Sequence, residues 1–263
     1  MTENILEITN LSKYFGGLAA VSDCSLNVKR GTITGIIGPN GSGKTTLFNL
    51  IAGNLKSSNG NVIFDEENIT DTPSYELFSK GLLRTFQIAH EFSNLSVLEN
   101  LMMVPGNQSG EKLMTALLKP KLVAEEETFI KEKAKEVVDF LNLGHLSNEL
   151  AGNLSGGQKK LLELGRTMMV DAKLVLLDEV GAGVNRTLLK DLGTAIEKLN
   201  KEKGYTFCMI EHDMDFIGRL CDPVIVMAEG SVLFKGSVEE AKKDEKVIES
   251  YLGRGSKLKL EDN

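Results

Sequence analysis

A glycine-rich loop between an apolar strand and an apolar helix constrains the fold of this chain most strongly. Residues 31–37 form a short β-branched run typical of a buried strand, and residues 45–52 form an apolar run that predicts a helix. The loop between them, residues 38–45, reads Gly-Pro-Asn-Gly-Ser-Gly-Lys-Thr and fits the spacing G-x-x-x-x-G-K-S/T. Its glycines let backbone N–H groups converge, which predicts a polyphosphate site at the helix N-terminus.

The residue types in this loop predict individual contacts with a nucleotide. Lys44 supplies a point charge for the β- and γ-phosphates, and the Thr45 hydroxyl can ligate Mg²⁺. The four fixed positions arise by chance on the order of once in a hundred such chains, and the flanking strand and helix make chance weaker still. The predicted nucleotide-binding residues are Gly38, Pro39, Asn40, Gly41, Ser42, Gly43, Lys44, Thr45 and Thr46.

A second apolar strand, residues 174–177, ends in two carboxylates, Asp178 and Glu179. In phosphate-loop proteins, an acid at such a strand end holds Mg²⁺, and we assign this role to Asp178. Glu179 is then placed to orient or deprotonate the water that attacks the γ-phosphate. An acidic turn without function is the alternative, and the phosphate loop makes the functional interpretation the stronger one.

The segment Ser155-Gly156-Gly157-Gln158 opens a helix predicted over residues 155–170. The Ser155 hydroxyl and the bare glycine backbone predict a second anion-binding helix end. Taken alone, the segment is explained better as an ordinary helix N-cap, followed by glycines that tolerate many backbone conformations, than as an anion site. A single nucleotide already fills the first loop, so a second anion site requires a further ligand.

Short apolar strands alternate with helices along the first and last thirds of the chain, which predicts an α/β fold with a largely parallel sheet. The middle differs from these flanks. Residues 125–143 carry apolar side chains at helical spacing, whereas residues 101–123 contain Pro105 and Pro120 and are expected to be irregular. A mostly helical part is therefore expected between two α/β parts.

Composition and charge exclude several classes of protein. The 30 basic and 37 acidic residues give a formal net charge of −7, which disfavours a protein that coats nucleic acid. Neither a membrane span nor a secretory signal is expected from the sequence. Cys24, Cys208 and Cys221 lack metal-ligand spacing and are expected to be reduced thiols of a cytoplasmic protein.

Together, these segments resemble the ATP-binding cassette ATPases, the motor subunits of ABC transporters. The resemblance extends over residues 5–252 and rests on motifs that appear in the family's order: the phosphate loop, Gln87 within residues 84–87, residues 154–158, the acidic pair, and His212. It implies ATP and Mg²⁺ as ligands and a phosphate-loop NTPase core that also carries an antiparallel β subdomain.

The resemblance also implies a domain organisation and partners. The nucleotide-binding core is expected at 1–90 and 166–252, an inserted helical subdomain with the signature segment at 91–165, and a polar tail at 253–263. Two ATPase subunits, identical or paralogous, are expected to bind head to tail, so that Ser155, Gly156, Gly157 and Gln158 close on the partner's ATP. Integral membrane subunits and, indirectly, a periplasmic or extracellular solute-binding protein are further expected partners, and the chain itself is expected at the cytoplasmic face of the membrane.

Carried over by position, the resemblance assigns further roles. Phe15 is expected to stack on adenine, with Tyr14 as a competitor and a core aromatic as the alternative. Gln87 is expected to contact Mg²⁺ and the attacking water, and His212 the γ-phosphate, which makes Glu179, His212 and Gln87 the predicted catalytic residues. Two positions depart from the family's usual pattern, Val180 in place of proline and Asn185 in place of an acid.

A narrower set of features looks like the larger ATPase of branched-chain amino acid importers, with urea-importer relatives nearly as similar. These features are residues 15–21, 84–87 and 247–253 and the insertion 101–124. The resemblance implies that a membrane subunit docks near residues 89–95, where Phe92, Leu95 and Val97 are expected to be partly exposed. A non-transport cassette protein acting on nucleic acid or the ribosome and a regulatory subunit with little turnover are the alternatives.

Overall fold

The computed structural model describes residues 3–85, 91–106 and 108–252 of the chain. Contacts among its residues divide the chain into two compact units. The first unit comprises residues 1–84, 173–181 and 197–263, and the second comprises residues 85–172 and 182–196. Gln87 and the expected tail 253–263 lie outside the described residues.

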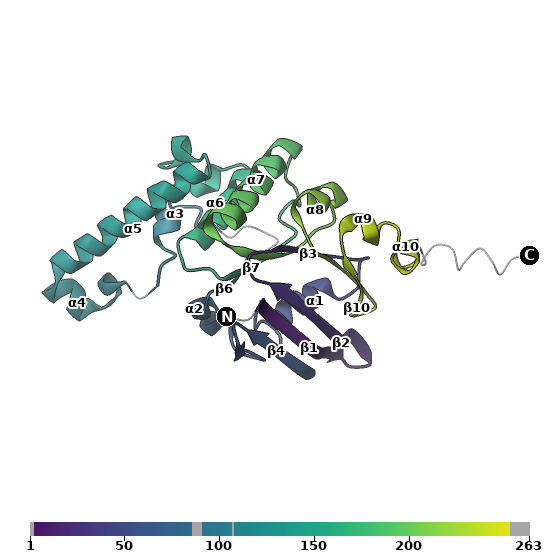
Figure 1. Ribbon diagram of the computed structural model, residues 1–263. Helices are drawn as coiled ribbons and strands as arrows, with labels where there is room; N and C mark the ends of the chain where they lie inside the picture. Colours follow the sequence, from purple (N-terminus) through teal and green to yellow (C-terminus); the bar gives the residue numbers. More distant parts are fainter. Residues whose placement is uncertain (1–2, 86–90, 107, 253–263) are drawn as a thin grey trace, which may run out of the picture. The chain divides into compact units, whose positions relative to one another are not determined.

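Among the described residues, the first unit contains a six-stranded sheet with the order β10-β9-β3-β8-β7-β6 (Figure 1). The pairs β6·β7, β7·β8, β8·β3 and β3·β9 are parallel, and β10 is antiparallel to β9. Every residue of β3, β7 and β8 is buried, as expected of unbroken apolar strands covered on both faces. The strands are β3 (Ile33–Ile37), β6 (Leu82–Arg84), β7 (Leu174–Asp178), β8 (Thr206–Ile210), β9 (Val224–Ala228) and β10 (Ser231–Gly236).

A second sheet of the first unit has the order β2-β1-β4-β5 and is antiparallel throughout its described strands. It consists of β1 (Asn4–Phe15), β2 (Leu18–Lys29), β4 (Asn59–Phe64) and β5 (Glu67–Asn68). One buried cluster joins both sheets and includes Leu6 of β1, Phe64 of β4, Ile36 of β3 and Phe48 of the helix after β3. The expected α/β core with a parallel sheet and an antiparallel β subdomain is confirmed.

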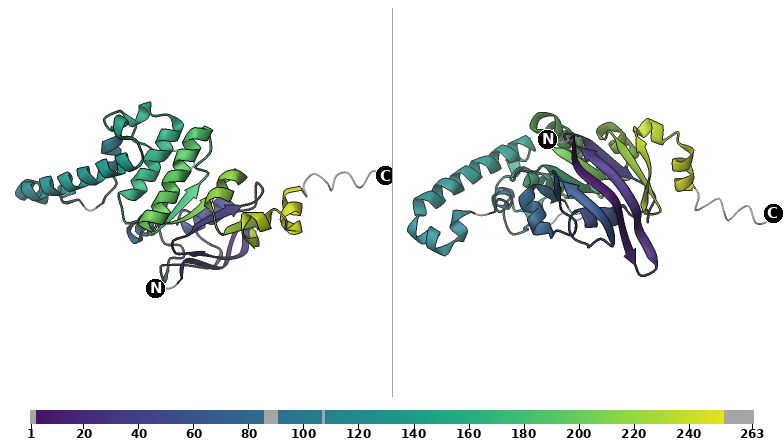
Figure 2. Two further views of the ribbon diagram at one scale, coloured as in Figure 1. Left: turned by 45° about the horizontal axis from the view of Figure 1, so that its top comes forward. Right: turned by 60° about the horizontal axis from the view of Figure 1, so that its bottom comes forward.

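The helices of the first unit follow strands of the sheets or close the chain (Figure 2). Asp213 caps the helix after β8 by accepting hydrogen bonds from the N–H groups of Asp215 at 3.0 Å and Phe216 at 2.9 Å. A capping box formed by Ser237 and Glu240 begins the next helix. These helices are α1 (Lys44–Ile51), α2 (Ser74–Lys80), α8 (Met214–Leu220), α9 (Val238–Ala241) and α10 (Glu245–Leu252).

The second unit is helical. Its longest helix is α5, which buries Ile130, Ala134, Val137 and Val138, the positions that the helical spacing of the sequence predicts. The helices are α3 (Val97–Met102), α4 (Leu113–Leu118), α5 (Pro120–Phe140), α6 (Gly156–Met168) and the first part of α7 (Arg186–Lys203). In the described ranges, no helix is long and apolar enough to cross a membrane.

Two expectations differ from the structure. Residues 101–123 are irregular only in part, because α4 lies within this stretch and α5 begins at Pro120, where proline is favourable in a first helical turn. The expected division between residues 165 and 166 falls inside α6. The second unit continues to Ala172 and includes residues 182–196 as well.

Candidate active site

The glycine loop after β3 is held by backbone groups that leave no room for side chains. Gly38 and Gly43 have positive φ angles of 151° and 97°. A Cβ atom at Gly38 would lie 2.1 Å from the carbonyl oxygen of Met227, and one at Gly43 would lie 2.4 Å from that of Ala20. Contacts this short do not occur in proteins, so the conformation of the loop depends on glycine at both positions.

Lys44 begins α1 and turns its ammonium group back over the loop. Its Nζ donates hydrogen bonds to the carbonyl oxygens of Gly38 at 2.8 Å and Pro39 at 3.0 Å. Burial lowers the pKa of Lys44, and the negative charges of Glu179 and Asp178 act in the opposite direction. In phosphate loops a lysine at this position contacts the β- and γ-phosphates, and for Lys44 this contact stays a prediction.

The N-terminus of α1 presents backbone N–H groups to an anion. Gly43 is the N-cap, and its residue type provides no side chain to cap the first turn. Thr45 lies in this turn and is exposed, whereas Lys44 before it is buried. N–H groups without a side-chain cap and the positive end of the helix dipole therefore lie at the end of the loop, and anion binding there stays a prediction.

Asp178 ends β7 in an ion pair that sequence reasoning missed. Its Oδ2 accepts a 2.7 Å hydrogen bond from Nη2 of Arg84, and Nη1 of Arg84 donates to Oδ1 of Asn49 at 2.6 Å. Only 11% of the Arg84 side chain and 5% of the Asp178 side chain are exposed. The guanidinium therefore connects β6, β7 and α1 at the carboxylate predicted to hold the metal.

Glu179 and His212, both predicted to be catalytic, lie in contact. Nε2 of His212 and Oε1 of Glu179 are 2.9 Å apart. Each follows a strand, and the N–H of Glu179 donates to the carbonyl oxygen of Ile210 at 2.9 Å, so the ends of the parallel neighbours β7 and β8 bring them together. Glu179 has a φ of 49°, a conformation that costs free energy in a residue other than glycine and that is common at functional sites.

Glu211 lies beside this pair, and sequence reasoning gave it no role. It is 4% exposed and accepts a hydrogen bond from the N–H of Gly181 at 2.7 Å. Burial raises the pKa of Glu211, the N–H groups of Gly181 and His212 oppose this shift, and the charge of Glu179 adds to it. The sequence offered one indication of a role for Glu211, which is that it directly follows a strand of apolar residues.

The segment predicted as a second anion site begins α6 with a capping box. Oγ of Ser155 accepts a hydrogen bond from the N–H of Gln158 at 3.4 Å, and the N–H of Ser155 donates to Oε1 of Gln158 at 2.9 Å. The N-cap interpretation of Ser155 is thus correct for the chain itself. Ser155 and Gly156 are exposed, and the Ser155 hydroxyl keeps a proton to donate, so anion binding stays a prediction.

Gly157 has a packing role that its motif did not indicate. A Cβ atom there would lie 2.5 Å from Cδ1 and 2.8 Å from Cβ of Leu188, so α6 and the first turns of α7 require glycine for their close approach. At Gly156 the nearest atom to such a Cβ is the carbonyl oxygen of Gly183, at 3.9 Å. Gly156 is therefore the residue on which anion binding can be tested without disturbing the packing, whereas Ser155 also caps α6.

Phe15 lies at the end of β1 and is 48% exposed, so the alternative that it is a core aromatic is wrong. It pairs with Leu18, which stands two residues, about 7 Å of strand, before Ala20. The carbonyl of Ala20 lies against Gly43 of the loop. Tyr14 is 46% exposed and remains a competitor for the adenine ring.

Gln87 and Tyr251 differ in what the structure says of them. Gln87, predicted to contact Mg²⁺ and the attacking water, lies outside the described residues. Tyr251 of α10 was not predicted, yet it makes a hydrogen bond with the backbone of Gly38. Burial raises the pKa of Tyr251, and this hydrogen bond lowers it.

The residues present fit a Mg²⁺ ion that is held jointly with a nucleotide. Over the described part of the chain, no group of three or more His, Cys, Asp or Glu residues can hold a metal ion. Thr45 and Asp178 offer one hydroxyl and one carboxylate, the hard oxygen donors that Mg²⁺ prefers. Mg²⁺ commonly takes its remaining ligands from substrate phosphates and water, so these few protein donors suffice.

Phosphate chemistry accounts for these contacts together, because the loop offers donors and a cation while the adjoining strand ends offer carboxylates and a histidine. Fold and site thus define a phosphate-loop ATPase. A family described as ABC transporter matches residues 21–182, more than half of the chain. The chain belongs to the ABC transporter family, as one of its ATP-binding and ATP-hydrolysing cassettes.

Curated relatives are similar over almost the whole chain. A probable branched-chain amino acid transport ATP-binding protein LivG of Archaeoglobus fulgidus is 43% identical over 249 residues, which are 95% of each chain. The LivG protein of Methanocaldococcus jannaschii is 41% identical over 96% of this chain and 98% of its own. A high-affinity branched-chain amino acid transport ATP-binding protein, BraF of Pseudomonas aeruginosa, is 34% identical over 96% and 99%.

Solved structures share the fold. A nucleotide-free ATP-binding cassette from an ABC transporter is 39% identical, with a TM-score of 0.81 over 94% of this chain and 98% of its own. The ADP conformation of an ATP-binding cassette of an ABC transporter has the same identity and TM-score and covers 96% of this chain and 100% of its own. Both confirm the expected cassette fold.

Proposed function

We propose that this cassette drives an importer of branched-chain amino acids. The observation that carries the proposal is the identity of 43% and 41%, over at least 95% of each chain, to two relatives whose names specify that transport. Urea or amide import remains the alternative, because the membrane and binding subunits, rather than this chain, select the solute.

The contacts of the first unit support a hydrolytic sequence. Lys44 and the uncapped N–H groups of α1 bind the phosphates of ATP, and Phe15 stacks on the adenine. Glu179 accepts a proton from the attacking water, and His212, held 2.9 Å from Glu179, orients that carboxylate and contacts the γ-phosphate. ADP and phosphate are the products.

Thr45, Asp178 and Gln87 would hold Mg²⁺, which supplies charge neutralisation at the β- and γ-phosphates when bound. Arg84 holds Asp178 in place, because its guanidinium donates a hydrogen bond to Oδ2 of Asp178 at 2.7 Å. Glu211 accepts the N–H of Gly181 at 2.7 Å and so fixes the backbone that follows Glu179. These contacts thus fix the metal-binding carboxylate of Asp178 and the backbone next to Glu179.

Two cassettes, identical or paralogous, bind head to tail in this proposal. The exposed start of α6 then faces the γ-phosphate held by the partner, with the Ser155 hydroxyl and the backbone at Gly156 as donors. ATP joins the two chains, and loss of the γ-phosphate weakens the contact, since the nucleotide has different affinities for the closed and open states.

A membrane subunit docks beside Phe92 on the second unit, which places the cassette at the cytoplasmic face of the membrane. Phe92 is 48% exposed, and the guanidinium of Arg166 lies 5.6 Å from its ring centre. Asn100 is buried and fixes the loop, accepting from the N–H of Phe92 at 2.8 Å and donating to its carbonyl at 3.1 Å. Val97 is fully buried, so the expectation that it is partly exposed is wrong.

The test is purification of the tagged chain from membranes, followed by reconstitution in proteoliposomes. We expect membrane subunits to copurify and the ATPase rate to rise with a binding protein loaded with leucine, isoleucine or valine. A response to urea instead would support the alternative importer. Copurification with ribosomes or nucleic acid, without membrane subunits, would overturn the proposal.

A further inference from the structure

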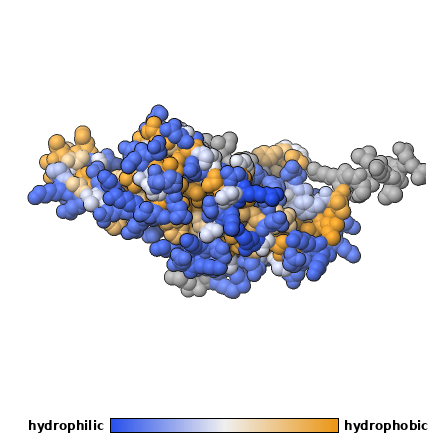
Figure 3. Space-filling model, turned by 90° about the horizontal axis from the view of Figure 1, so that it is seen from above, coloured by the Kyte–Doolittle hydropathy of each residue, from blue (hydrophilic) through white to orange (hydrophobic). Residues whose placement is uncertain are grey.

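Helix α4 of the second unit turns its apolar side chains away from the protein. Leu113, Met114, Leu117 and Leu118 are 83%, 65%, 74% and 67% exposed. Positions spaced i, i+1, i+4 and i+5 lie on one face of a helix, so the four side chains form a single apolar strip. In Figure 3 the hydrophobic colour at the left end of the molecule lies over α4 and the start of α5.

The opposite face of α4 is the one that packs on the protein, and it is built of smaller residues. Thr115 and Ala116 are half-buried, and α4 contacts η1 (Ser109–Glu111) and α5. A surface helix normally buries its leucines and exposes its polar side, so the arrangement of α4 is inverted. Exposed apolar patches of this kind mark interaction sites.

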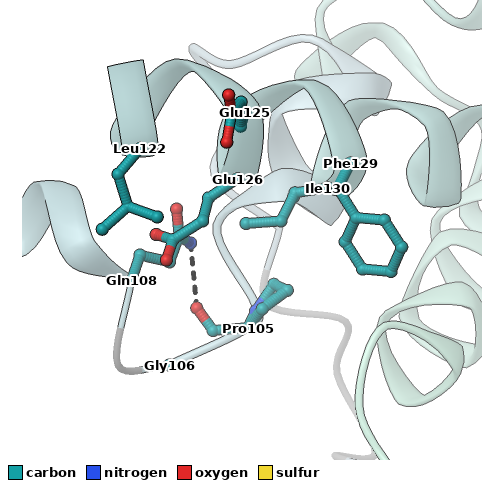
Figure 4. Close-up of a pocket in the computed structure, with 8 residues that line it drawn as sticks. All are labelled: Pro105, Gly106, Gln108, Leu122, Glu125, Glu126, Phe129 and Ile130. Carbon is teal, nitrogen blue, oxygen red and sulfur yellow. Dashed lines mark hydrogen bonds between the residues drawn. The ribbon is translucent and has the colours of Figure 1, made fainter. Parts of the chain in front are cut away.

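Specific hydrogen bonds fix this inverted arrangement. Ser109, at the start of η1, donates from its N–H and its Oγ to the Glu126 carboxylate of α5, at 2.8 and 2.7 Å. Nε2 of Gln108 donates to the carbonyl oxygen of Pro105 at 2.9 Å, beside a cavity of about 350 Å³ (Figure 4). Leu122 and Phe129 of α5 line this cavity, and their exposed side chains extend the apolar surface of α4 onto α5.

The charges around the strip identify what covers it. Lys112, Lys119 and Lys121 are exposed at its two ends, and residues 112–124 contain no acidic side chain in a chain whose net charge is −7. Apolar strips with lysines at their edges suit anionic bilayers, because leucines enter the headgroup boundary while lysines reach the phosphates. Protein interfaces instead favour Trp, Tyr and Arg anchors and are poor in Lys, and the α4 strip has no such anchor.

We propose that α4 and the first turn of α5 form a contact with the surface of an anionic lipid bilayer. The contact goes beyond the proposed function, because it involves lipid directly rather than a membrane subunit. It also leaves the phosphate loop and Ser155 untouched, so its failure and the failure of the ATPase assignment are measured separately.

An environment-sensitive label tests the contact on the full chain. Cys24, Cys208 and Cys221 are buried, and burial raises the pKa of Cys24 and Cys208 to about 12, so a cysteine placed at Leu117 reacts selectively. We expect a blue shift of an NBD label on Leu117→Cys with phosphatidylglycerol-containing vesicles, and none with phosphatidylcholine alone. Tyr75→Cys, at a residue that is 72% exposed on α2, is the control and should not shift.

Paired substitutions separate local from overall charge in vesicle sedimentation. Lys119→Glu with Lys121→Glu changes the net charge as much as Lys131→Glu with Lys135→Glu, at exposed lysines further along α5. We expect about tenfold weaker binding for the first pair and a much smaller change for the second. Leu113→Ser with Leu117→Ser should also weaken binding about tenfold or more while ATP binding is unchanged.

Several outcomes would overturn the proposal. They are no binding to anionic vesicles, equal losses in the two lysine pairs, and a label on residue 117 that shifts only when solubilised membrane subunits are added. Self-association of the chain that Leu113→Ser with Leu117→Ser abolishes would assign the strip to a second copy instead.

Discussion

The active site and α4 depart from the usual distribution of side chains in opposite directions. In the first unit, Lys44, Asp178 and Glu211 are ionisable and buried. In the second unit, Leu113 and Leu117 are apolar and mostly exposed. Burying a charge costs free energy, and each exposed leucine forfeits about 25 cal/mol per Å² of apolar area. Folding alone favours neither arrangement, so each points to a ligand: a polyphosphate in one case and a lipid surface in the other.

The two regions also differ in how they are held. Arg84 and Asp178 meet across 94 positions of sequence, whereas Ser109 and Glu126 are 17 positions apart. Chemistry on a phosphate needs groups fixed to a fraction of an ångström, and neighbouring strands of one sheet, here far apart in the sequence, provide that rigidity. A bilayer contact needs only that apolar side chains be presented, and local hydrogen bonds suffice for this.

The largest expected effect is on catalysis. Glu179→Gln should lower ATP turnover by about 10²–10⁴-fold, because the amide cannot accept a proton, and should leave ATP binding intact. Steady-state hydrolysis by the purified complex measures the first effect and nucleotide titration the second. Glu202→Gln, at an exposed residue of α7, is the control. Near-normal turnover of Glu179→Gln would remove Glu179 from the role of base.

The next largest effect is on stability and concerns the buried ion pair of Arg84 and Asp178. Arg84→Leu leaves the Asp178 carboxylate buried without its partner and should destabilise the chain by about 3 kcal/mol. The measurement is the midpoint of urea unfolding. A loss below about 1 kcal/mol, the range of exposed pairs, would mean that Arg84 does not hold Asp178.

Substitutions at the start of α6 separate packing from anion binding. Gly157→Ala should cost about 1–3 kcal/mol in urea unfolding, because its Cβ would meet Leu188. Gly156→Asp has room and should keep the fold and nucleotide binding by the isolated chain while it abolishes ATP-dependent closure and most hydrolysis in the complex. Unimpaired closure with Gly156→Asp would contradict the composite site.

A smaller effect depends on pH. Burial raises the pKa of Glu211 in the folded chain above 4.5, so the folded state binds more protons than the unfolded state once the pH exceeds that value. Stability therefore falls as pH rises from about 4.5 towards the folded pKa. The Glu211→Gln variant lacks this loss. Its unfolding free energy should therefore increase relative to that of the unaltered chain as pH rises. A pH-independent difference would contradict the raised pKa.

The smallest expected effect is at α4. Leu117→Ser should change the unfolding free energy of the isolated chain by no more than about 0.5 kcal/mol, because the side chain is already exposed. Leu101→Ala, at a buried residue of the same unit, should cost about 2–5 kcal/mol. Comparable losses of unfolding free energy at the two positions would contradict the conclusion that Leu117 is exposed while Leu101 is packed in the core.

What the sequence predicts well is local. The loop 38–45 and the strand that ends at Asp178 are continuous segments whose spacing and hydrophobicity define them, and β8 and α8 place His212 by the same logic. Arg84 and Glu211 were missed because their partners lie far away in sequence, where no periodicity connects them. The close approach of Gly157 to Leu188 likewise depends on how two helices pack.

The insertion shows the other limit of sequence reasoning. Prolines and glycines in residues 101–123 indicate loops, yet six residues between Lys112 and Lys119 form α4, and α5 starts on Pro120 itself. A helix this short gains little from propensity and is stabilised by its contacts with α5 and η1, which the sequence does not display.

The ion pair of Arg84 has a mechanical consequence. Arg84 is the last residue of the first unit before the chain first enters the second, at the peptide bond to Thr85. The same residue grips Asp178 and Asn49. A displacement of Thr85 therefore acts directly on the residue whose guanidinium binds the carboxylate at the end of β7, because Arg84 and Thr85 share a peptide bond.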